Sequence, residues 1–523
     1  TQTHESFLKC LTTQISESNT TSTSKSIIYT RNNPSYSTIF NSTAQNPRFV
    51  TPTTRKPVVI VTPLHNSHIQ ASIYCSKKYG VQIRIRSGGH DYEGLSYTSE
   101  VTFFILDMRN LSSIDVDVAS KSAWVQSGAT VGQLHYRIAE KNLNLAFPGG
   151  VGDTIGIGGQ LGGGGYGYST RKYGLSADHI LDAQLIDAQG RILNRETMGE
   201  DLFWAIRGGG AASFGVVVAW KVQLVDMPSI VTLIESPRKW VDNATKKFIH
   251  RYQRRAHKVD KDLTIIVRFL AVNSSDKEGK EIQADITGLF HGRKERLLPL
   301  MKKEFPELGL LEAECTEMTF IQAVLYFNVL TNGQSLDFLL NRELTFKYQP
   351  VKVKSDYVKK PIPDDVIEKL VDRLYDEEVL DGYIEFFPYG GKMDEIPESA
   401  IPFPHRAGNI YNLRYTVLWE EYENENTTSV NEHLSWARSA YNYMTPYVSK
   451  NPRGAFLNFR DLDIGVNPIH CDVKNNYNCV QQASVWGTKY FKDNFYRLVD
   501  VKTKVDPTNY FTYEQSIPPL LSH

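Results

Sequence analysis

The sequence has no net charge and no long apolar run. Its 523 residues include 58 basic and 58 acidic side chains, with no basic cluster. Such a balanced chain offers nothing that binds a nucleic-acid backbone, so we expect no nucleic-acid partner. No apolar stretch approaches the roughly 20 residues that span a bilayer, so we expect no membrane partner either. The 41% apolar content is enough for large cores in two or more domains.

Several catalytic signatures are absent as well. There is no P-loop, no G-x-S-x-G elbow, no H-E-x-x-H and no paired C-x-x-C. Phosphoryl transfer, serine hydrolysis and zinc chemistry are therefore disfavoured, and no metal site is predicted. A G-x-G-x-x-G match at Gly162, Gly164 and Gly167 does not lie between a strand and a helix of a βαβ unit, so a Rossmann domain is disfavoured too.

Cysteine is scarce, and its count of five is odd, which leaves at least one thiol unpaired. We expect Cys10 to pair with Cys75 and Cys471 with Cys479, with free buried thiols as the alternative. Six glycosylation sequons favour an N-glycosylated protein of the secretory pathway, extracellular or vacuolar. They lie at Asn19, Asn41, Asn110, Asn243, Asn273 and Asn426. We expect the N-terminus, TQTHESFLKC, to be a processed end.

Glycine, in contrast, is concentrated in one segment, FPGGVGDTIGIGGQLGGGGYG, from Phe147 to Gly167. Glycine lets a backbone turn sharply and approach a ligand closely, so this density predicts a bed for an extended cofactor. A flexible linker is the alternative, but the interleaved Val151, Ile157 and Leu161 are anchoring apolar side chains that Gly/Ser linkers lack.

The flanking segments alternate between strand and helix patterns. We expect helices at 6–14, 66–79, 131–141 and 202–210, strands at 57–62, 81–86, 102–107, 123–126 and 216–225, and a hairpin at 180–193. Past Pro228, alternating strands such as 263–271 and 383–387 and charged helices such as 364–376 are typical of an antiparallel sheet backed by helices. From about Pro452 the glycine and aromatic punctuation returns, so we expect this segment to rejoin the first domain.

A second glycine turn, SGGHDYEG, follows the strand at 81–86 and holds His90. Its place at the end of a strand predicts a second loop that faces the ligand. A loop histidine is either a hydrogen-bonding structural residue or an attachment site, and the turn alone does not decide between these roles.

Seven motifs occur in order over almost the whole chain: RSGGHDYEG (86–94), FPGG (147–150), GGGYG (163–167), KYGLSAD (172–178), DLFWAIRGGG (201–210), NFRDLDIG (458–465) and EQSIPP (514–519). Together they resemble the plant berberine bridge enzyme-like flavoproteins, and most of all the tetrahydrocannabinolic acid synthase branch. The resemblance implies a two-domain α+β fold of the vanillyl-alcohol-oxidase (PCMH) type. An FAD-binding domain (1–228 and 452–523) is then split around a substrate-binding domain (229–451) whose antiparallel sheet is backed by helices.

The resemblance also implies FAD as the cofactor. His90 matches the 8α-histidyl attachment residue, but the second attachment residue, a cysteine in FPGG-x-C, is Gly152 here, so no cysteinyl link forms. The predicted cofactor-binding residues lie in the motifs and beside them: Arg86, Ser87, Gly88, Gly89, His90, Asp91, Ser96, Gly128, Gly149, Gly150, Gly152, Thr154, Gly158, Gly163, Gly164, Tyr166, Gly167, Asp178, Asn509 and Phe511.

Other departures from the family fall on catalytic positions. Phe459 replaces the tyrosine of N-Y-R-D-L-D, and Asn412 and Arg414 replace the glutamate and tryptophan of Y-E-L-W-Y-T. Arg268 stands where the cannabinoid branch has a pocket histidine, and Phe387 where it has tyrosine. Two bases are thus lost and two guanidiniums gained, and arginine polarises carbonyls or binds phenolates but does not act as a base.

This exchange favours a cycloaddition, because that reaction removes no proton from the substrates. An enzyme accelerates it mainly by positioning the two substrates and polarising one of them. A few plant members of the family are FAD-dependent intermolecular Diels-Alderases that join a chalcone to a diene derived from a prenylated phenol. We interpret the chain as one of these, with polyphenol substrates and a mainly structural flavin. Arg414, Arg268 and Glu385 are the predicted catalytic residues, and Phe387, Phe459, Asn412 and Tyr92 the predicted substrate-binding residues.

Three alternatives stay open. The arginines could form a salt bridge with Glu385 that only stabilises the sheet. The chain could be an oxidase that passes electrons from a phenolic, alkaloid or carbohydrate substrate to oxygen, with Tyr92, Tyr383, Tyr389 or Glu385 as the base. It could also be a catalytically silent flavin-binding glycoprotein.

Overall fold

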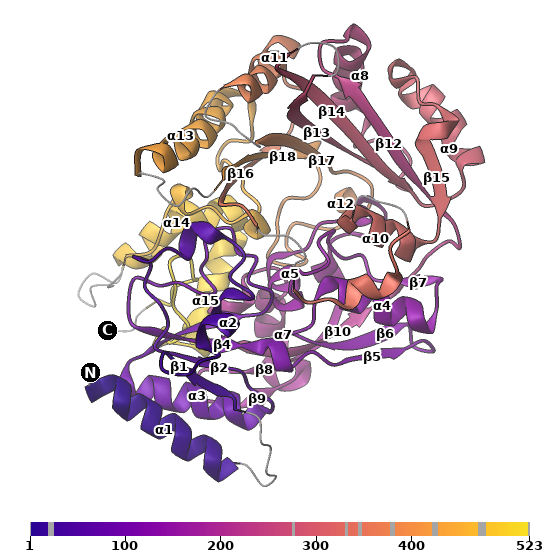
Figure 1. Ribbon diagram of the computed structural model, residues 1–523. Coiled ribbons are helices and arrows are strands. Elements are labelled where there is room, and N and C mark those ends of the chain that lie inside the picture. Colours follow the sequence, from indigo (N-terminus) through magenta and orange to yellow (C-terminus); the bar gives the residue numbers. More distant parts are fainter. Residues whose placement is uncertain are drawn as a thin grey trace.

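The computed structural model describes residues 2–18, 26–274, 278–329, 333–343, 348–376, 382–420, 427–468 and 477–520. They form two parts in Figure 1: a lower part built from both ends of the chain and an upper part built from its middle. Within these residues no helix is both long enough and apolar enough to cross a membrane. The same residues hold no group of three or more His, Cys, Asp or Glu side chains suited to bind a metal ion.

The N-terminal segment builds a small mixed sheet with two helices packed beside it. Its strands are β1 (Ile28–Thr30), β2 (Val59–Val61), β3 (Gln82–Arg86) and β4 (Phe103–Asp107), in the order β1-β2-β4-β3. Both β2 and β3 run parallel to β4, as the predicted strand–helix–strand rhythm around α3 (Asn66–Tyr79) requires. The expected Cys10–Cys75 disulfide joins α1 (Gln2–Ser18) to α3. Cys315 is buried and free, and Cys471 lies outside the described residues, so its pairing with Cys479 stays a prediction.

A second, antiparallel sheet of the lower part has the order β5-β6-β10-β8-β9. Its strands are β5 (Ile114–Asp117), β6 (Ser122–Gln126), β8 (Ile180–Ile186), β9 (Ile192–Leu193) and β10 (Val216–Gln223), with β8 and β9 forming the expected hairpin. The pair β7 (Leu145–Ala146) and β11 (Val225–Asp226) lies beside it. Helix α4 (Val131–Lys141) starts at a capping box, because Thr130 and Gln133 each bond the other's backbone N–H.

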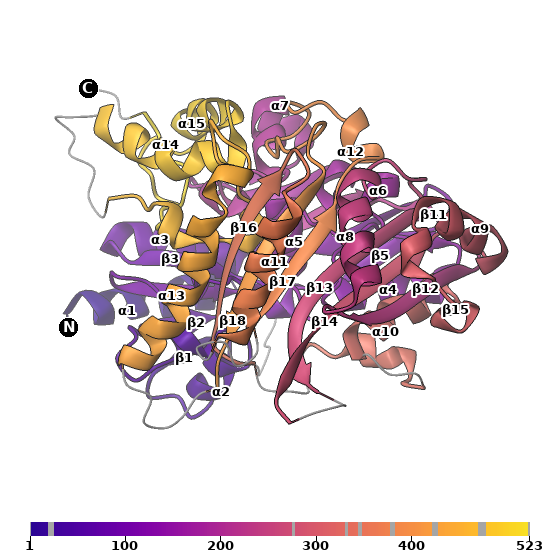
Figure 2. The same cartoon turned by 90° about the horizontal axis from the view of Figure 1, so that it is seen from above.

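The glycine segment contains α5 (Ile157–Gly163), a helix that the sequence did not lead us to expect. Further helices of the lower part are α2 (Tyr36–Asn41), α6 (Thr170–Tyr173) and α7 (Arg195–Ile206). The C-terminal α14 (Tyr477–Phe491) and α15 (Asn494–Val505) return to this part, as expected: Phe495 and Leu498 of α15 share a core with Phe203 and Trp204 of α7. Figures 1 and 2 show α14 and α15, in yellow, beside elements of the first half of the chain.

The upper part is a seven-stranded antiparallel sheet in the order β15-β12-β14-β13-β17-β18-β16, and the helices cover its outer face. The strands are β12 (Val231–Lys239), β13 (Leu263–Asn273), β14 (Lys280–Phe290), β15 (Cys315–Met318), β16 (Val351–Val358), β17 (Tyr383–Pro388) and β18 (Tyr411–Leu418). The covering helices are α8 (Asn243–Arg255), α9 (Lys294–Glu304), α11 (Asp364–Asp372) and α13 (Thr427–Tyr443). The same stretch of sequence also contains α10 (Phe320–Val329) and the one-turn α12 (Lys392–Glu395). The predicted antiparallel sheet backed by helices is confirmed, and its strands lie within the range 229–451 proposed for the substrate domain.

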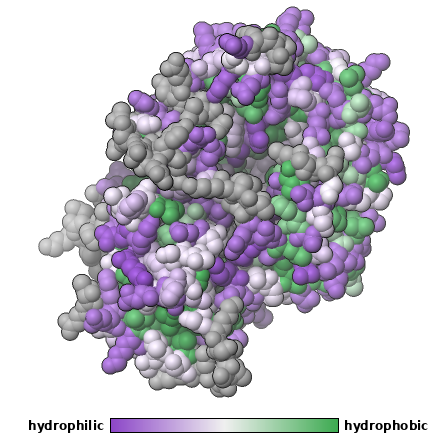
Figure 3. All heavy atoms as spheres, in the orientation of Figure 1, coloured by the Kyte–Doolittle hydropathy of each residue, from purple (hydrophilic) through white to green (hydrophobic). Residues whose placement is uncertain are grey.

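Residues just after the glycine segment connect the two parts. Arg171 is fully buried and donates to main-chain carbonyls of the upper part, at Tyr389 (2.9 Å), Val259 (2.7 Å) and Leu263. The Ser169 hydroxyl bonds Nε2 of His291, at 2.9 Å, where β14 has just ended. These bonds fix the position of the glycine segment relative to the seven-stranded sheet. Between the two parts the molecular surface is hollowed (Figure 3).

We predict that acid weakens this connection through His291. Burial lowers the pKa of His291 to about 4, and Nδ1 bonds the Asp262 carbonyl, so the folded state holds a neutral imidazole. Unfolding restores the ordinary pKa of about 6.5, so the unfolded chain binds the proton more readily and stability falls as the pH drops below 6.5. From pH 7 to pH 5 His291 alone should remove about 2 kcal/mol of unfolding free energy.

The measurement is the urea unfolding midpoint of wild type and His291→Gln across this pH range. Glutamine does not titrate, so the variant should lose less stability on acidification even if it is less stable at pH 7. Parallel pH curves for the two proteins would contradict the assignment.

Candidate functional site

A cavity of about 520 Å³ lies between the inner face of the seven-stranded sheet and the glycine loops of the lower part. The sheet contributes side chains of β13, β17 and β18. The lower part contributes the turn after β3, helix α5 and strand β10, and the C-terminal segment adds residues 456–460 and 511–513. Segments far apart in the sequence therefore meet at one elongated site.

Three charged side chains form an arginine–glutamate ladder across neighbouring strands of the sheet. Arg268 on β13 is directly opposite Glu385 on β17, which is directly opposite Arg414 on β18. Opposed residues on antiparallel strands have Cβ atoms about 5 Å apart, so both guanidiniums reach one carboxylate. Arg268 Nε donates to Glu385 Oε1 at 2.8 Å, and Arg414 Nε donates to Oε2 at 2.5 Å. The structure thus brings the three predicted catalytic residues together on the cavity wall.

The ladder carries a net charge of +1. Glu385 is 1% exposed, and burial alone would raise the pKa of its carboxyl group, but the charges of Arg414 and Arg268 outweigh burial and lower it. Burial likewise opposes the charge of Arg414, yet the Glu385 carboxylate raises the pKa of that guanidinium. One carboxylate therefore neutralises only one of two guanidiniums, and Arg268 remains 43% exposed at the edge of the site.

Aromatic rings surround the Arg414 guanidinium. Its central carbon lies 5.1 Å from the ring centroid of Phe387 and 4.8 Å from that of Phe459, and Nη1 donates to Tyr92 Oη at 3.4 Å. Tyr92 and Phe459 pack edge to face with centroids 6.3 Å apart. Cation–π contacts of this kind stabilise a partly desolvated guanidinium, and the three aromatic residues line the cavity beside it.

Asn412, the fourth predicted substrate-binding residue, does not line the cavity. It lies two residues before Arg414 and so shares its face of β18, as expected. Its side chain is buried, however, and Nδ2 donates to the main-chain carbonyl of Asp356 at 3.0 Å. The packing of β16 against β18 therefore takes up the amide that the sequence placed in the pocket.

His90 lies in the turn after β3 and lines the cavity. Its Nε2 bonds Thr154 Oγ1 at 3.0 Å, and its ring packs edge to face on Tyr348 at 5.6 Å. Burial lowers the pKa of His90 to about 4, so the imidazole is neutral at ordinary pH. Only an unprotonated ring nitrogen has a lone pair with which to form a covalent bond to a flavin, so the neutral imidazole is the form that attachment requires.

Twelve of the predicted cofactor-binding residues line the cavity: Ser87, Gly88, Gly89, His90, Asp91, Ser96, Gly150, Gly152, Gly158, Gly163, Tyr166 and Phe511. The others lie outside its lining: Arg86, Gly128, Gly149, Thr154, Gly164, Gly167, Asp178 and Asn509. Two of these have clear structural roles. Arg86 pairs with the buried Asp107 at 2.7 Å, and Asp178 pairs with Arg406 at 2.7 Å. Direct contact of these residues with the cofactor stays a prediction.

Several glycines are required by close backbone packing within the protein as well as by any ligand. A Cβ on Gly88 would lie 2.3 Å from the Gly156 nitrogen, and a Cβ on Gly167 would lie 2.0 Å from the Gly149 carbonyl oxygen. These positions need glycine because two backbone segments touch there. At Gly159, in contrast, a Cβ would meet no atom within 4 Å, and the residue lines the cavity. We attributed the whole segment to a cofactor, whereas part of it is close backbone packing.

Buried polar atoms along the cavity fit a polar ligand such as the adenosine diphosphate half of FAD. Arg84 on β3 pairs with Glu514 through Nη2, at 2.9 Å. Its Nε and Nη1, and the Ser96 hydroxyl, are buried without a hydrogen-bond partner among the described residues. Such donors are costly unless a ligand or water bonds them. Ser87–His90, α5 and these donors are therefore the residues suited to hold the cofactor.

The sequence analysis missed two arginines at the site. Arg84 was hidden in an alternating strand pattern, although an arginine beside the glycine turn could have drawn attention to it. Arg342 lies beside the cavity lining, in a segment that packs on α4, and it donates to the main-chain carbonyls of Ser87, at 3.0 Å, and Gly128. No local motif marks it, because its partners lie more than 200 residues earlier in the chain.

Comparison with known proteins identifies the family. The family model described as an FAD binding domain matches residues 57–195, and the one described as berberine and berberine like matches residues 455–518. Cannabidiolic acid synthase-like 2 of Cannabis sativa is 47% identical in an alignment 523 positions long that covers 99% of this chain and 93% of the relative. Tetrahydroberberine oxidase of Berberis wilsoniae is 48% identical over 520 residues, 99% of this chain and 94% of the relative.

A solved structure agrees with these relatives. Berberine bridge enzyme-like protein 28 of Arabidopsis thaliana matches with a TM-score of 0.90 at 45% identity, covering 99% of this chain and 100% of that one. This match confirms the predicted two-domain α+β fold, and the FAD-domain match supports FAD as the cofactor. The chain therefore belongs to the berberine bridge enzyme-like family of FAD-dependent oxidoreductases.

Proposed function

We propose that the chain catalyses an intermolecular Diels–Alder cycloaddition between a chalcone-type dienophile and a diene derived from a prenylated phenol. In this reaction two carbon–carbon bonds form and no proton or electron leaves the substrates. The arginine–glutamate ladder is the observation that carries the proposal, since it offers hydrogen-bond donors and positive charge but no available base. FAD, when bound, supplies hydride-accepting chemistry that the cycloaddition does not use.

Four candidate acids and bases on the cavity wall are poorly suited to remove a substrate proton. Glu385 is bonded by two guanidiniums, which lower the pKa of its carboxyl group and so weaken it as a base. Burial raises the pKa of the Tyr92 hydroxyl, so its phenolate is rare at neutral pH. His90 has a pKa of about 4, and Asp91 pairs with Arg460 at 2.8 Å. Phe459, where the family has a tyrosine, offers no oxygen at all.

The same wall is suited to polarise a dienophile. A guanidinium in a largely desolvated pocket stabilises developing negative charge on a carbonyl or phenolate oxygen without reorganising, and such preorganised donors supply much of an enzyme's rate enhancement. The ladder's net charge of +1 adds to this effect. Phe387, Phe459 and Tyr92 offer ring faces on which polyphenols can stack, which orients both reactants.

An oxidase acting on a phenolic, alkaloid or carbohydrate substrate is the second candidate, because a relative 48% identical to this chain is a tetrahydroberberine oxidase. The two are separated by mixing the FAD-loaded protein with prenylated phenols without oxygen. Bleaching of the flavin, followed by peroxide when air returns, would establish the oxidase. Adduct formed from a preformed diene and a chalcone, with no flavin reduction and no oxygen uptake, would establish the cycloaddition. A protein that does neither would be a silent flavoprotein.

We predict that Arg414→Ala lowers the rate of adduct formation about 100- to 1000-fold while FAD stays bound, because the polarising donor is lost. The matched variant Glu385→Gln keeps both arginines and should lower the rate only about tenfold, with an unchanged pH profile near neutrality. Rates are measured by chromatography of the adduct, and FAD content by absorbance. Unchanged turnover in Arg414→Ala would refute its role, and complete loss in Glu385→Gln would make Glu385 the base.

We further propose that His90 holds FAD covalently, since its neutral imidazole lines the cavity and Gly152 excludes a second link. Acid precipitation should then keep the flavin with the wild-type protein and release it from His90→Ala. Absorbance of pellet and supernatant provides the measurement. Thr154→Val, which removes the hydroxyl that bonds His90 but leaves the imidazole in place, is the control. Flavin released freely from wild type would overturn the covalent link.

Polyphenols as partners and passage through the secretory pathway are proposals as well. The Cys10–Cys75 disulfide supports an oxidising compartment. Asn41, Asn243 and Asn273 are exposed, as glycosylation requires, whereas Asn110 Nδ2 donates to the Thr62 carbonyl at 3.0 Å and is less accessible. Asn19 and Asn426 lie outside the described residues.

A further inference from the structure

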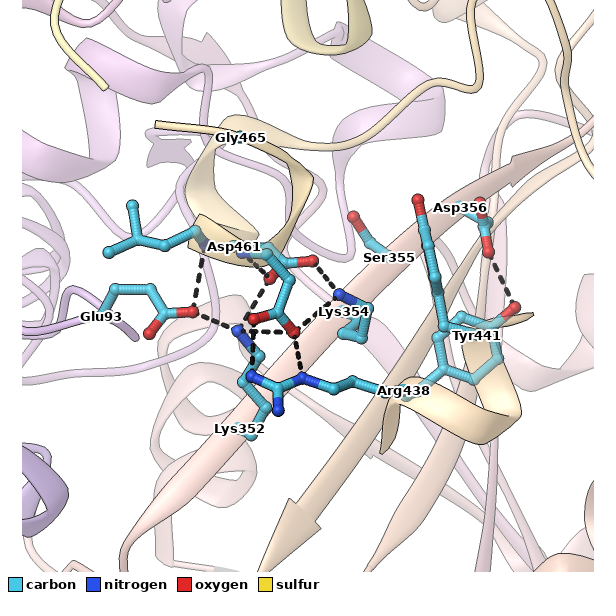
Figure 4. A network of polar contacts seen from close by, with 12 residues as sticks. Glu93, Lys352, Lys354, Ser355, Asp356, Arg438, Tyr441, Asp461 and Gly465 are labelled. Carbon is cyan, nitrogen blue, oxygen red and sulfur yellow. Dashed lines mark hydrogen bonds and ion pairs between the residues drawn. The ribbon is translucent and has the colours of Figure 1, made fainter. Parts of the chain in front are cut away.

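A buried network of ion pairs lies beside the cavity, at the edge of the seven-stranded sheet (Figure 4). Lys352 and Lys354 project from β16, and the Asp461 carboxylate lies between them, accepting from Lys352 Nζ at 2.7 Å and from Lys354 Nζ at 2.5 Å. Lys352 Nζ also donates to Glu93 Oε1. Lys354 Nζ bonds Asp463 at 3.2 Å, and Asp463 also pairs with Arg438 of α13.

Four members of this network are almost completely buried. Lys352 is 1% exposed, and Glu93, Lys354 and Asp461 are each 2% exposed. Burial opposes the charge of Lys352, but Asp461 and Glu93 raise the pKa of its ammonium group overall. Buried ion pairs of this kind add little net stability compared with apolar packing, and what they do provide is a fixed geometry for the groups that they join.

Side-chain contacts hold β16 to the C-terminal segment on both faces of the strand. Lys352 and Lys354 share one face of this edge strand, next to α13, while Ser355 lies on the other face, directly opposite Arg414. The Ser355 hydroxyl accepts from the Phe456 backbone N–H at 3.1 Å. The C-terminal segment therefore holds the strand through Phe456 on one face and through Asp461 on the other.

The same contacts fix two aromatic walls of the cavity. Glu93 directly follows Tyr92, and Asp461 comes two residues after Phe459. Glu93 Oε1 also accepts from the Leu462 N–H at 3.2 Å, which ties the two loops to each other. Because Lys352 reaches both carboxylates, one ammonium group joins the loops that carry Tyr92 and Phe459 to the sheet that carries Arg414.

We propose that Lys352 is a positioning residue that sets the distance between the Tyr92–Phe459 wall and Arg414, and with it the affinity and orientation of aromatic ligands. Lys354 is the built-in comparison, since it has the same strand, the same face, the same burial and a bond to Asp461, but no bond to Glu93. The choice of an aromatic ligand rests on the proposed function, whereas the placement of the two loops does not.

The test compares Lys352→Met, Lys354→Met and Glu93→Gln/Lys352→Met, each loaded with FAD. Two readouts are taken well below the unfolding midpoint: the visible circular dichroism of the flavin, and the dissociation constant of 2′,4′-dihydroxychalcone. Lys352→Met should weaken chalcone binding on the order of 10- to 100-fold and change the dichroism, whereas Lys354→Met should shift binding less than about threefold.

The double variant separates positioning from stability. Lys352→Met removes the ammonium shared by Glu93 and Asp461, which then keep only Arg48 (3.2 Å) and Lys354 (2.5 Å) as cation partners. The loss destabilises the fold and could prevent folding, whereas Glu93→Gln/Lys352→Met removes a charge of each sign. Its unfolding midpoint should recover, and its flavin dichroism and chalcone affinity should stay as altered as in Lys352→Met. Recovery of both readouts together with stability, or equal changes in the two lysine variants, would overturn the proposal. Wild type that binds no chalcone would contradict only the proposed function, and the dichroism comparison would still decide the positioning role.

Discussion

The site depends on an imbalance of charge that the sheet register imposes. Three strands place Arg268, Glu385 and Arg414 side by side, and one carboxylate cannot neutralise two guanidiniums. The surplus positive charge is tolerated because the cation lies against the rings of Phe387 and Phe459 and because Arg268 stays partly in water. This constraint is why we interpret the pocket as a source of hydrogen-bond donors. Glu385, which is bonded by both guanidiniums, holds them in place, and the guanidiniums are the groups available to a ligand.

The salt bridge that we weighed as a purely structural alternative is present, and it does not remove the arginines from the pocket. All three side chains line the cavity, but Glu385 is the most buried of them, and both guanidiniums are more exposed than it is. A bond to one carboxylate uses only some of the five N–H donors of arginine, so the bridge can hold Arg414 in place and leave donors for a substrate. Structural and catalytic roles are thus compatible in this geometry.

Much of the fold followed from local patterns, because periodicity and glycine turns act over short distances. The helix at Asn66–Tyr79 and the alternating strand before the His90 turn were predicted with nearly their observed bounds. The meeting of Arg268, Glu385 and Arg414 followed from the family resemblance. What could not be predicted depends on long-range packing: the amide of Asn412 turned toward β16, Arg342 reaching the Ser87 loop, and glycines required by neighbouring backbone. No local signal specifies such partners.

The packing around β16 also affects how readily the sheet could add a strand from another molecule. An edge strand normally presents unpaired N–H and C=O groups that can add a strand from another molecule. Here the Asn46 side chain bonds both the N–H and the C=O of Val351, and the Ser449 N–H bonds the Tyr357 carbonyl, so outward-facing groups near both ends of β16 are already paired. The buried charges of Lys352 and Lys354 lie on the same strand. The segments packed against β16 therefore also occupy hydrogen-bonding groups that an added strand would need at this edge of the seven-stranded sheet.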